Sequence, residues 1–143
     1  MQKQMRILSI TAQKPHSTGS GVYLTELVRN WQEMGCVQGV VAGIYEEDYA
    51  DFPEDVTFYP VKFHTEKLPF AITGMSDEMP YESTRYRDLT PEMVRQFHDR
   101  FRYIIDKAVR ELEPDLIVCH HLYLLTAMVR EWYPAVSYTH LTL

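Results

Sequence analysis

The feature that most constrains the fold is a set of short apolar runs that alternate with helical patterns. One run covers residues 5–11, and others cover residues 36–44, 56–63 and 115–119. Their apolar side chains do not alternate strictly with polar ones, which is typical of strands buried on both faces. Pro60, inside the third run, predicts an edge strand or a bulge. The pattern therefore predicts an α/β fold: a Rossmann-like parallel sheet with helices on both faces.

Helical periodicity separates these runs. Residues 22–34 place apolar side chains along one side, and Gly35 is a natural end for this helix. The strongest pattern follows Thr90 and Pro91, where a capping threonine and a first-turn proline begin a long amphipathic helix. A short third helix is predicted over residues 122–132.

Composition limits the class of protein. The chain has 143 residues, of which 45% are hydrophobic and 24% charged, so one globular domain is expected rather than a disordered chain. Its net charge of -6 and its lack of a basic cluster argue against a nucleic-acid partner. No apolar run approaches the ~20 residues that span a bilayer. Cys36 and Cys119 lie far apart in apolar stretches, which indicates buried free thiols in a reducing, cytoplasmic compartment.

The end of the chain has an unusual sequence. Residues 135–143 read AVSYTHLTL, which resembles the translated read-through of a sequencing-library adapter. We therefore expect residues 1–134 to be part of a natural domain and residues 135–143 to be a non-native tail. The alternative is an ordinary short final strand.

Two glycines lie between the first predicted strand and the first predicted helix. Gly19, Ser20 and Gly21 place backbone N–H groups at a helix N-terminus, where the positive end of the helix dipole attracts anions. This loop also follows a strand of a parallel sheet, at the end where ligands bind. It lacks the third glycine of a dinucleotide-binding fingerprint and the Lys-Ser/Thr of a P-loop, so a plain turn is the alternative.

Two histidines follow the last predicted strand. Neighbouring side chains of an extended chain point to opposite sides, so only one of His120 and His121 is expected to face a ligand crevice. That divergence, together with the lack of a nearby carboxylate, argues against a shared metal. An imidazole in the crevice can hydrogen-bond a sugar or phosphate, or transfer a proton near neutral pH. A pair of surface or structural histidines is the alternative.

A long segment without clear periodicity, residues 64–89, precedes the long helix. Residues 74–86 are rich in Tyr, Asp, Ser and Arg, which suit a polyhydroxylated or phosphorylated ligand. Asp77, Tyr81 and Arg85 are its candidate acceptor-binding residues. A lid or interface loop that touches no ligand is the alternative.

Taken together, these segments resemble the N-terminal domain of a retaining glycosyltransferase of the GT-B fold, of the group 1 or family 4 type. The resemblance covers residues 5–134 and is carried by three segments: MRILSI, TGSGVYLTEL and DLIVCHHLYLLTAMV. Two positions depart from it. Many relatives carry Gly-Gly where this chain has Gly-Ser-Gly, and many carry a further histidine at the position of Val118.

The resemblance implies two Rossmann-like domains that face a cleft, and the C-terminal domain, which binds most of the nucleotide-sugar, is missing here. It places Gly19, Ser20 and Gly21 near the donor diphosphate and His120 near the transferred sugar as the catalytic residue, with His121 as a neighbour on the acceptor side. The implied partners are a nucleotide-sugar donor and a sugar, lipid or small-molecule acceptor, with peripheral membrane contact left open. No cofactor and no metal are implied, and the chain alone is expected to be inactive.

Two other functions stay open on the sequence. The main alternative is a non-catalytic Rossmann-like module that recognises a nucleotide or a phosphosugar. A dehydrogenase is a weaker one, because the fingerprint glycines are missing and no acid is well placed after the second strand to bind a ribose; Glu46 or Glu47 is the nearest candidate.

Overall fold

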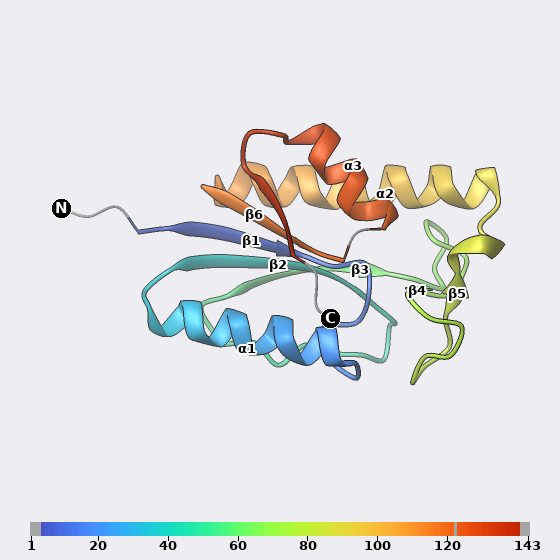
Figure 1. The fold of residues 1–143 in the computed structure, drawn as a ribbon, viewed down its shortest axis with the longest axis horizontal. Helices are drawn as coiled ribbons and strands as arrows, with labels where there is room; N and C mark the ends of the chain where they lie inside the picture. Colours follow the sequence, from blue (N-terminus) through green and yellow to red (C-terminus); the bar gives the residue numbers. More distant parts are fainter. Residues whose placement is uncertain (1–3, 122, 141–143) are drawn as a thin grey trace.

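The centre of the molecule is a five-stranded sheet, seen in a computed structural model that describes residues 4–121 and 123–140. Every strand pair in this sheet is parallel, and the strand order is β3-β2-β1-β6-β7 (Figure 1). The strands are β1 (Arg6–Ile10), β2 (Val37–Ile44), β3 (Thr57–Lys62), β6 (Leu116–His120) and β7 (Ser137–His140). The predicted α/β fold with a Rossmann-like parallel sheet is therefore confirmed.

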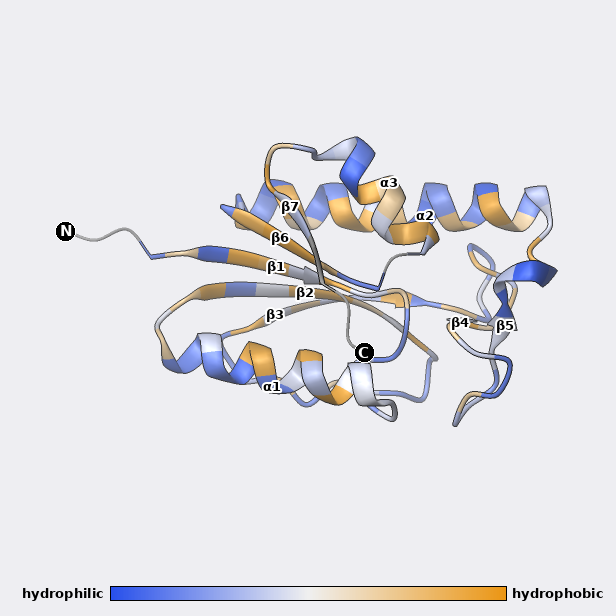
Figure 2. Cartoon of the chain, viewed as in Figure 1, coloured by the Kyte–Doolittle hydropathy of each residue, from blue (hydrophilic) through white to orange (hydrophobic). Residues whose placement is uncertain are grey.

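Helices cover both faces of the sheet. Helix α1 (Gly19–Glu33) lies on one face, and α2 (Pro91–Leu112) and α3 (Leu124–Trp132) lie on the other (Figure 1). Figure 2 shows the result in hydropathy: the strands are largely hydrophobic, and the helices carry hydrophobic stripes between hydrophilic turns. Each large apolar side chain buried in this way contributes about 1.5–3 kcal/mol, and the larger of the two core clusters includes the buried face of α2. The fully buried side chains of that cluster include Phe63, Phe97, Phe101, Ile105 and Ile117.

The ends of the helices follow the predicted signals. The Thr90 hydroxyl accepts a hydrogen bond from the Met93 N–H at 3.2 Å, so it caps α2 as expected. Gly35 follows α1 with φ +86°, a left-handed conformation that glycine adopts without strain. Pro60 lies on β3, which is an edge strand of the sheet, so the predicted edge position is confirmed.

The segment between β3 and α2 has more regular structure than its sequence suggests. It contains two short parallel strands, β4 (Thr73–Gly74) and β5 (Thr84–Arg85), and a 3-10 turn over Tyr86–Asp88. We call residues 64–89 the insert. In Figure 1 the insert lies at the end of the molecule where β1 and β2 finish. It therefore borders the carboxyl ends of the strands, where the predicted site residues lie.

The final strand involves residues of the unusual tail. Residues Ser137–His140 form β7, which pairs in parallel with β6, and the Ile117 N–H donates to the Val136 carbonyl at 2.8 Å. Four residues of the tail thus form a short strand. Strand pairing uses backbone groups that every sequence has, so the non-native origin of residues 135–143 stays a prediction.

Candidate functional site

The strand order defines where a ligand would bind. From β1 the chain builds outward to β2 and β3, and it later returns to the other side of β1 with β6. The order therefore reverses between β1 and β6, and ligands of open parallel sheets bind at such a reversal, outside the carboxyl ends of the strands. Both predicted motifs emerge here, because the glycine loop follows β1 and the histidine pair ends β6.

The three residues of the glycine loop have different roles. Gly21 is buried, and its N–H donates to the capping Thr18 hydroxyl at 3.1 Å. A Cβ atom at Gly21 would lie 2.7 Å from the backbone N of His16. Gly21 therefore allows the start of α1 to pack closely against the preceding loop. Its N–H is already bonded to Thr18 and is not open to a ligand.

The first two amides of α1 are better placed for a ligand. Gly19 is the first residue of the helix and has no atom within 4 Å of a Cβ built on it. Across the described ranges, 4–121 and 123–140, neither the Gly19 N–H nor the Ser20 N–H has an acceptor. The first turn of α1 also contains no acidic residue. Of the three predicted diphosphate-binding residues, Gly19 and Ser20 therefore keep amides that can bind an anion.

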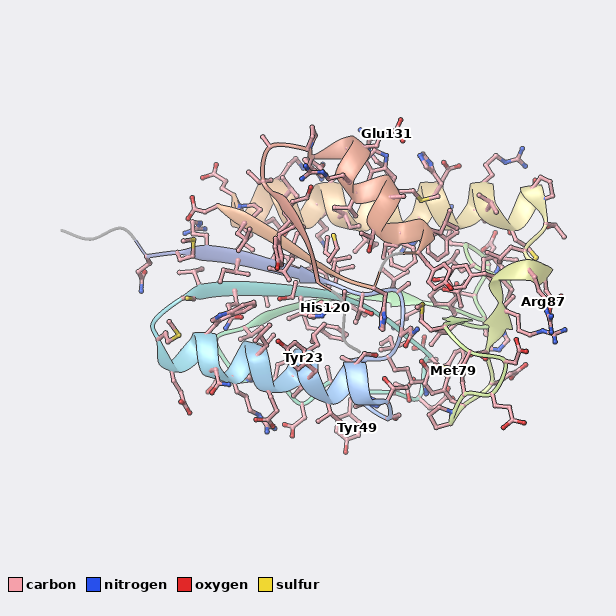
Figure 3. All side chains as sticks on the ribbon, viewed as in Figure 1. Tyr23, Tyr49, Met79, Arg87, His120 and Glu131 are labelled. Carbon is pink, nitrogen blue, oxygen red and sulfur yellow. The ribbon has the colours of Figure 1, made fainter. Side chains whose placement is uncertain are left out.

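His120 is buried at the carboxyl end of β6, with 5% of its surface exposed. Its neighbour Cys119 packs into the core beneath α2 and α3, so strand alternation turns His120 to the α1 side, as Figure 3 shows. His120 lines a cavity of about 10 Å³ at the reversal point, between the loop after β1 and the start of α3. The imidazole expected to face an open crevice is therefore buried at the wall of a small cavity.

His121 lines the same cavity as His120, and the strand alternation on which their expected divergence depends does not extend to His121. The reason is a backbone turn. His121 has φ +75°, which ends the extended conformation on which strand alternation depends. The Thr126 hydroxyl donates to the His121 carbonyl at 2.5 Å and fixes this turn against the first turn of α3.

The insert residues predicted to bind an acceptor do not form one group. Asp77 is exposed and lies 3.5 Å from Arg87, which projects away from the sheet in Figure 3. Arg85 pairs with Asp88 at 2.7 Å. Tyr81 points inward instead, and its hydroxyl accepts a hydrogen bond from the backbone N–H of Lys14 at 3.4 Å. None of these three predicted residues lines the cavity of His120.

Lys14 is a buried residue whose role the sequence did not reveal. Only 8% of its surface is exposed, and its ammonium lies 2.8 Å from the Asp48 carboxylate. It also lies 4.8 Å from the ring centroids of both Tyr45 and Tyr81, which adds two cation–π contacts. We call Lys14, Asp48, Tyr45 and Tyr81 the lysine cluster. It connects the loop after β1 to the insert.

The titration of the lysine cluster reflects its burial. Burial acts to raise the pKa of the Asp48 carboxyl, but hydrogen bonds from Lys14 and from the Tyr45 N–H outweigh it, so this pKa lies below its ordinary value. Burial raises the pKa of the Tyr81 hydroxyl to about 12. Burial also raises the pKa of the Tyr45 hydroxyl, so at neutral pH the cluster holds one carboxylate and two neutral phenols beside the ammonium.

Further residues of the site were also missed. Gln13 lies three residues after the end of β1 and lines the His120 cavity with 3% of its surface exposed. Tyr86 of the insert and Tyr123 before α3 line the cavity too, and their rings stack with centroids 5.0 Å apart. The one available signal was position: Gln13 lies in the loop that follows the first strand of a parallel sheet, where ligand contacts concentrate.

The arrangement can hold a small polar ligand with backbone amides and polar side chains. No group of three or more His, Cys, Asp or Glu side chains that could hold a metal ion occurs among the described residues. Within the same part of the chain, no helix has the length and apolar character to cross a membrane.

Comparison with known proteins adds no assignment: no protein-family model matches this chain, and no curated protein matches it.

Proposed function

We propose that this chain is the acceptor-side domain of a retaining glycosyltransferase that uses a nucleotide-sugar donor. One observation carries the proposal: the strand order reverses between β1 and β6, and both motifs of the family resemblance emerge at that point. The loop after β1 supplies the N-terminus of α1, and the end of β6 supplies His120. Open parallel sheets bind their ligands at such a reversal point, outside the carboxyl ends of the strands.

The amides of Gly19 and Ser20 would bind the donor diphosphate. As the bond between the sugar and the diphosphate breaks, negative charge grows on the leaving group. Preorganised N–H donors at a helix N-terminus stabilise such charge without having to reorganise. The Gly21 amide stays with the Thr18 hydroxyl, so its part is to shape the loop.

His120 would hold the transferred sugar by hydrogen bonding and not serve as a nucleophile. Its burial at the end of β6 restricts the ring to one position. A fixed donor or acceptor favours the distorted, positively charged sugar of the transition state over the ground state, so its contribution appears mainly in kcat. His121 lines the same cavity and would contribute to the same contacts.

The insert would form the acceptor side of the cleft. Arg85 and Asp77 are exposed there and can meet an acceptor, although each already has an ionic partner. Tyr81 would act indirectly, because its ring and hydroxyl pack on Lys14. Its role is to hold the insert over the carboxyl ends of the strands.

Steady-state kinetics of the enzyme formed by this chain and its natural downstream domain test the proposal. We expect His120→Ala to lower kcat by about 10²-fold or more, with a smaller change in the KM for the nucleotide-sugar. His98→Ala is the matched control, because His98 lies on α2 with 42% of its side chain exposed and does not line the cavity. It should keep its activity.

Two results would redirect the proposal. If His120→Ala and His98→Ala have equal activity, His120 has no part in the reaction. If the protein binds a nucleotide or a phosphosugar but transfers no sugar from any donor, it is the non-catalytic module instead.

A further inference from the structure

An exposed aromatic ring lies beside the His120 cavity. Tyr123, directly before α3, lines this cavity and has 50% of its surface exposed. Tyr86 of the insert stacks on one face of this ring, with centroids 5.0 Å apart and planes inclined by 16°. Because Tyr86 packs against that face, the exposed surface of Tyr123 belongs to the other face and to the ring edge. A flat apolar surface is therefore open at the site.

The stacked pair is anchored at both of its residues. The Tyr123 carbonyl accepts a hydrogen bond from the Thr126 N–H at 2.9 Å, and the Tyr86 carbonyl accepts one from the Leu89 N–H at 3.2 Å. The pair also joins the insert to the start of α3, so each ring restricts the orientation of the other. A surface that is held in place before a ligand arrives loses little conformational entropy on binding.

The free face of Tyr123 has no other role in the described structure. Among residues 4–121 and 123–140, the Tyr123 hydroxyl has no hydrogen-bond partner, and Tyr86 is the one aromatic or cationic group in contact with its ring. Neither the packing of α3 nor that of the insert therefore uses this face.

The surroundings of Tyr123 favour an uncharged ring as the ligand. None of the described residues that line the cavity is Asp, Glu, Lys or Arg, so none of these ionic side chains would attract a charged ligand there. Of the same described lining residues, Tyr123 is the one large apolar side chain that is exposed, so a lipid chain finds no continuous apolar surface. A pyranose fits better, because its C–H face can pack on an aromatic ring while its hydroxyls stay in water.

We propose that the free face of Tyr123 is the stacking surface for a neutral pyranose ring of the acceptor, so that the acceptor is a carbohydrate. This rests on the proposed function and narrows its acceptor from a sugar, lipid or small molecule to a sugar. Tyr86 is then a positioning residue, because it acts on the ligand only through the Tyr123 ring.

Saturation-transfer NMR of the 143-residue chain tests which ligand packs on this ring. The probes are the methyl glycosides of glucose, galactose and mannose. D-glucuronate serves as a charged ring, uridine as a nucleobase and hexanol as a lipid chain. We expect at least one methyl glycoside to bind through the C–H protons of one ring face, and to bind more strongly than these three other ligands.

Variants of Tyr123 make the test specific. Tyr123→Ala should weaken glycoside binding about three- to tenfold, which is what one stacking contact contributes. Tyr123→Phe keeps the ring and should bind as the wild type does. Tyr123→Leu keeps apolar bulk without a flat face, so it should bind as weakly as Tyr123→Ala. Tyr49→Ala is the matched control, because Tyr49 is 81% exposed and does not line this cavity.

Kinetics separate this inference from the proposed function. In the enzyme formed with the natural downstream domain, Tyr123→Ala should raise the KM for the acceptor about three- to tenfold and change kcat less, the reverse of His120→Ala. If the enzyme transfers a sugar and Tyr123→Ala leaves this KM unchanged, the inference fails and the proposed function stands. If the chain binds glycosides through Tyr123 but the enzyme transfers no sugar, the proposed function fails and the ring contact stands.

Four NMR results would overturn the inference. Equal glycoside binding by the wild type and Tyr123→Ala would place the sugar elsewhere on the chain. Stronger binding of uridine or hexanol would make a nucleobase or a lipid the ligand of this surface. Binding of D-glucuronate as strong as that of the methyl glycosides would refute the preference for a neutral ring. No binding of any glycoside would mean that Tyr123 serves only to hold the insert against α3.

Discussion

Replacing Asp48 with asparagine should destabilise the chain strongly, because it leaves the buried Lys14 ammonium without a counter-charge. Removing one partner of a buried ion pair costs about 3–5 kcal/mol. Asparagine keeps an oxygen that can accept from the Tyr45 N–H, and the two aromatic rings still face the ammonium. We therefore place the cost near the lower end, at about 3 kcal/mol. For a chain of this size, that is a fall in Tm of about 6–12 °C.

The pH dependence gives the same prediction a second readout. The pKa of folded Asp48 lies below its ordinary value of 3.8, so its stabilising effect is complete above that pH and is lost as pH falls through the folded pKa. The difference in Tm between the wild type and Asp48→Asn should therefore be constant near neutral pH and shrink below about pH 4.

An exposed ion pair nearby provides the control. Glu46 lies 3.3 Å from Lys62, with 75% and 44% of their side chains exposed, so Glu46→Gln should change Tm very little. Thermal unfolding of the three proteins between pH 3 and pH 7 makes the comparison. Equal Tm values for Asp48→Asn and Glu46→Gln, or a difference that does not shrink in acid, would refute the argument that burial makes the Lys14 pair strong.

Three further predictions concern the backbone and the thiols. Gly21→Ala should lower the free energy of unfolding by about 1–3 kcal/mol, because its Cβ would meet backbone atoms that cannot move aside. Gly19→Ala should change that free energy by less than about 0.5 kcal/mol, because nothing lies near its Cβ. Denaturant titration of both variants makes the comparison. Burial raises the pKa of the Cys119 thiol to about 12, so at pH 8 a thiol reagent should label the partly buried Cys36 first and Cys119 only on unfolding. Thr90→Ala should cost about 1 kcal/mol by removing the cap of α2, and an equal cost for an exposed mid-helix threonine-to-alanine change elsewhere would contradict the capping argument.

Much of the fold could be predicted because the signals for it are local. Uninterrupted apolar runs mark the strands of a covered parallel sheet, and β1 begins and ends within a residue of the expected run. Thr90 with Pro91 defines the start of α2 at the residue where the structure has it. Edge strand β3 was indicated by Pro60, since proline lacks the N–H that a central strand needs.

The insert could not be predicted because its structure depends on distant contacts. Strands β4 and β5 have two residues each, too few for a periodic signal. They are held by Tyr45, whose hydroxyl accepts from the Ile72 N–H at 3.1 Å and donates to the Glu82 carbonyl. No local pattern connects a tyrosine after β2 to these two backbone groups.

The positions of the candidate site residues could be predicted, but their side-chain contacts could not, because these too depend on residues distant in sequence. The positions of the glycine loop and the histidine pair follow from which residues come after which strands. The conformation of His121 depends on a hydrogen bond from Thr126, and the burial of Lys14 depends on Asp48. These are pairings in space, so the sequence showed the motifs without showing how their side chains are arranged.

The place of β1 at the centre of the sheet has a consequence for synthesis of the chain. β1 can pair with β2, and β2 with β3, once the first 62 residues have emerged, but the other neighbour of β1, β6, begins only at residue 116. The Arg6 N–H then bonds to the Asp115 carboxylate at 3.0 Å, across a sequence separation of 109 residues. At about 5–20 residues per second, the ribosome needs about 3–11 s to add the residues in between. For those seconds the centre of the finished sheet is an open edge, the kind of surface that chaperones bind and that aggregation uses.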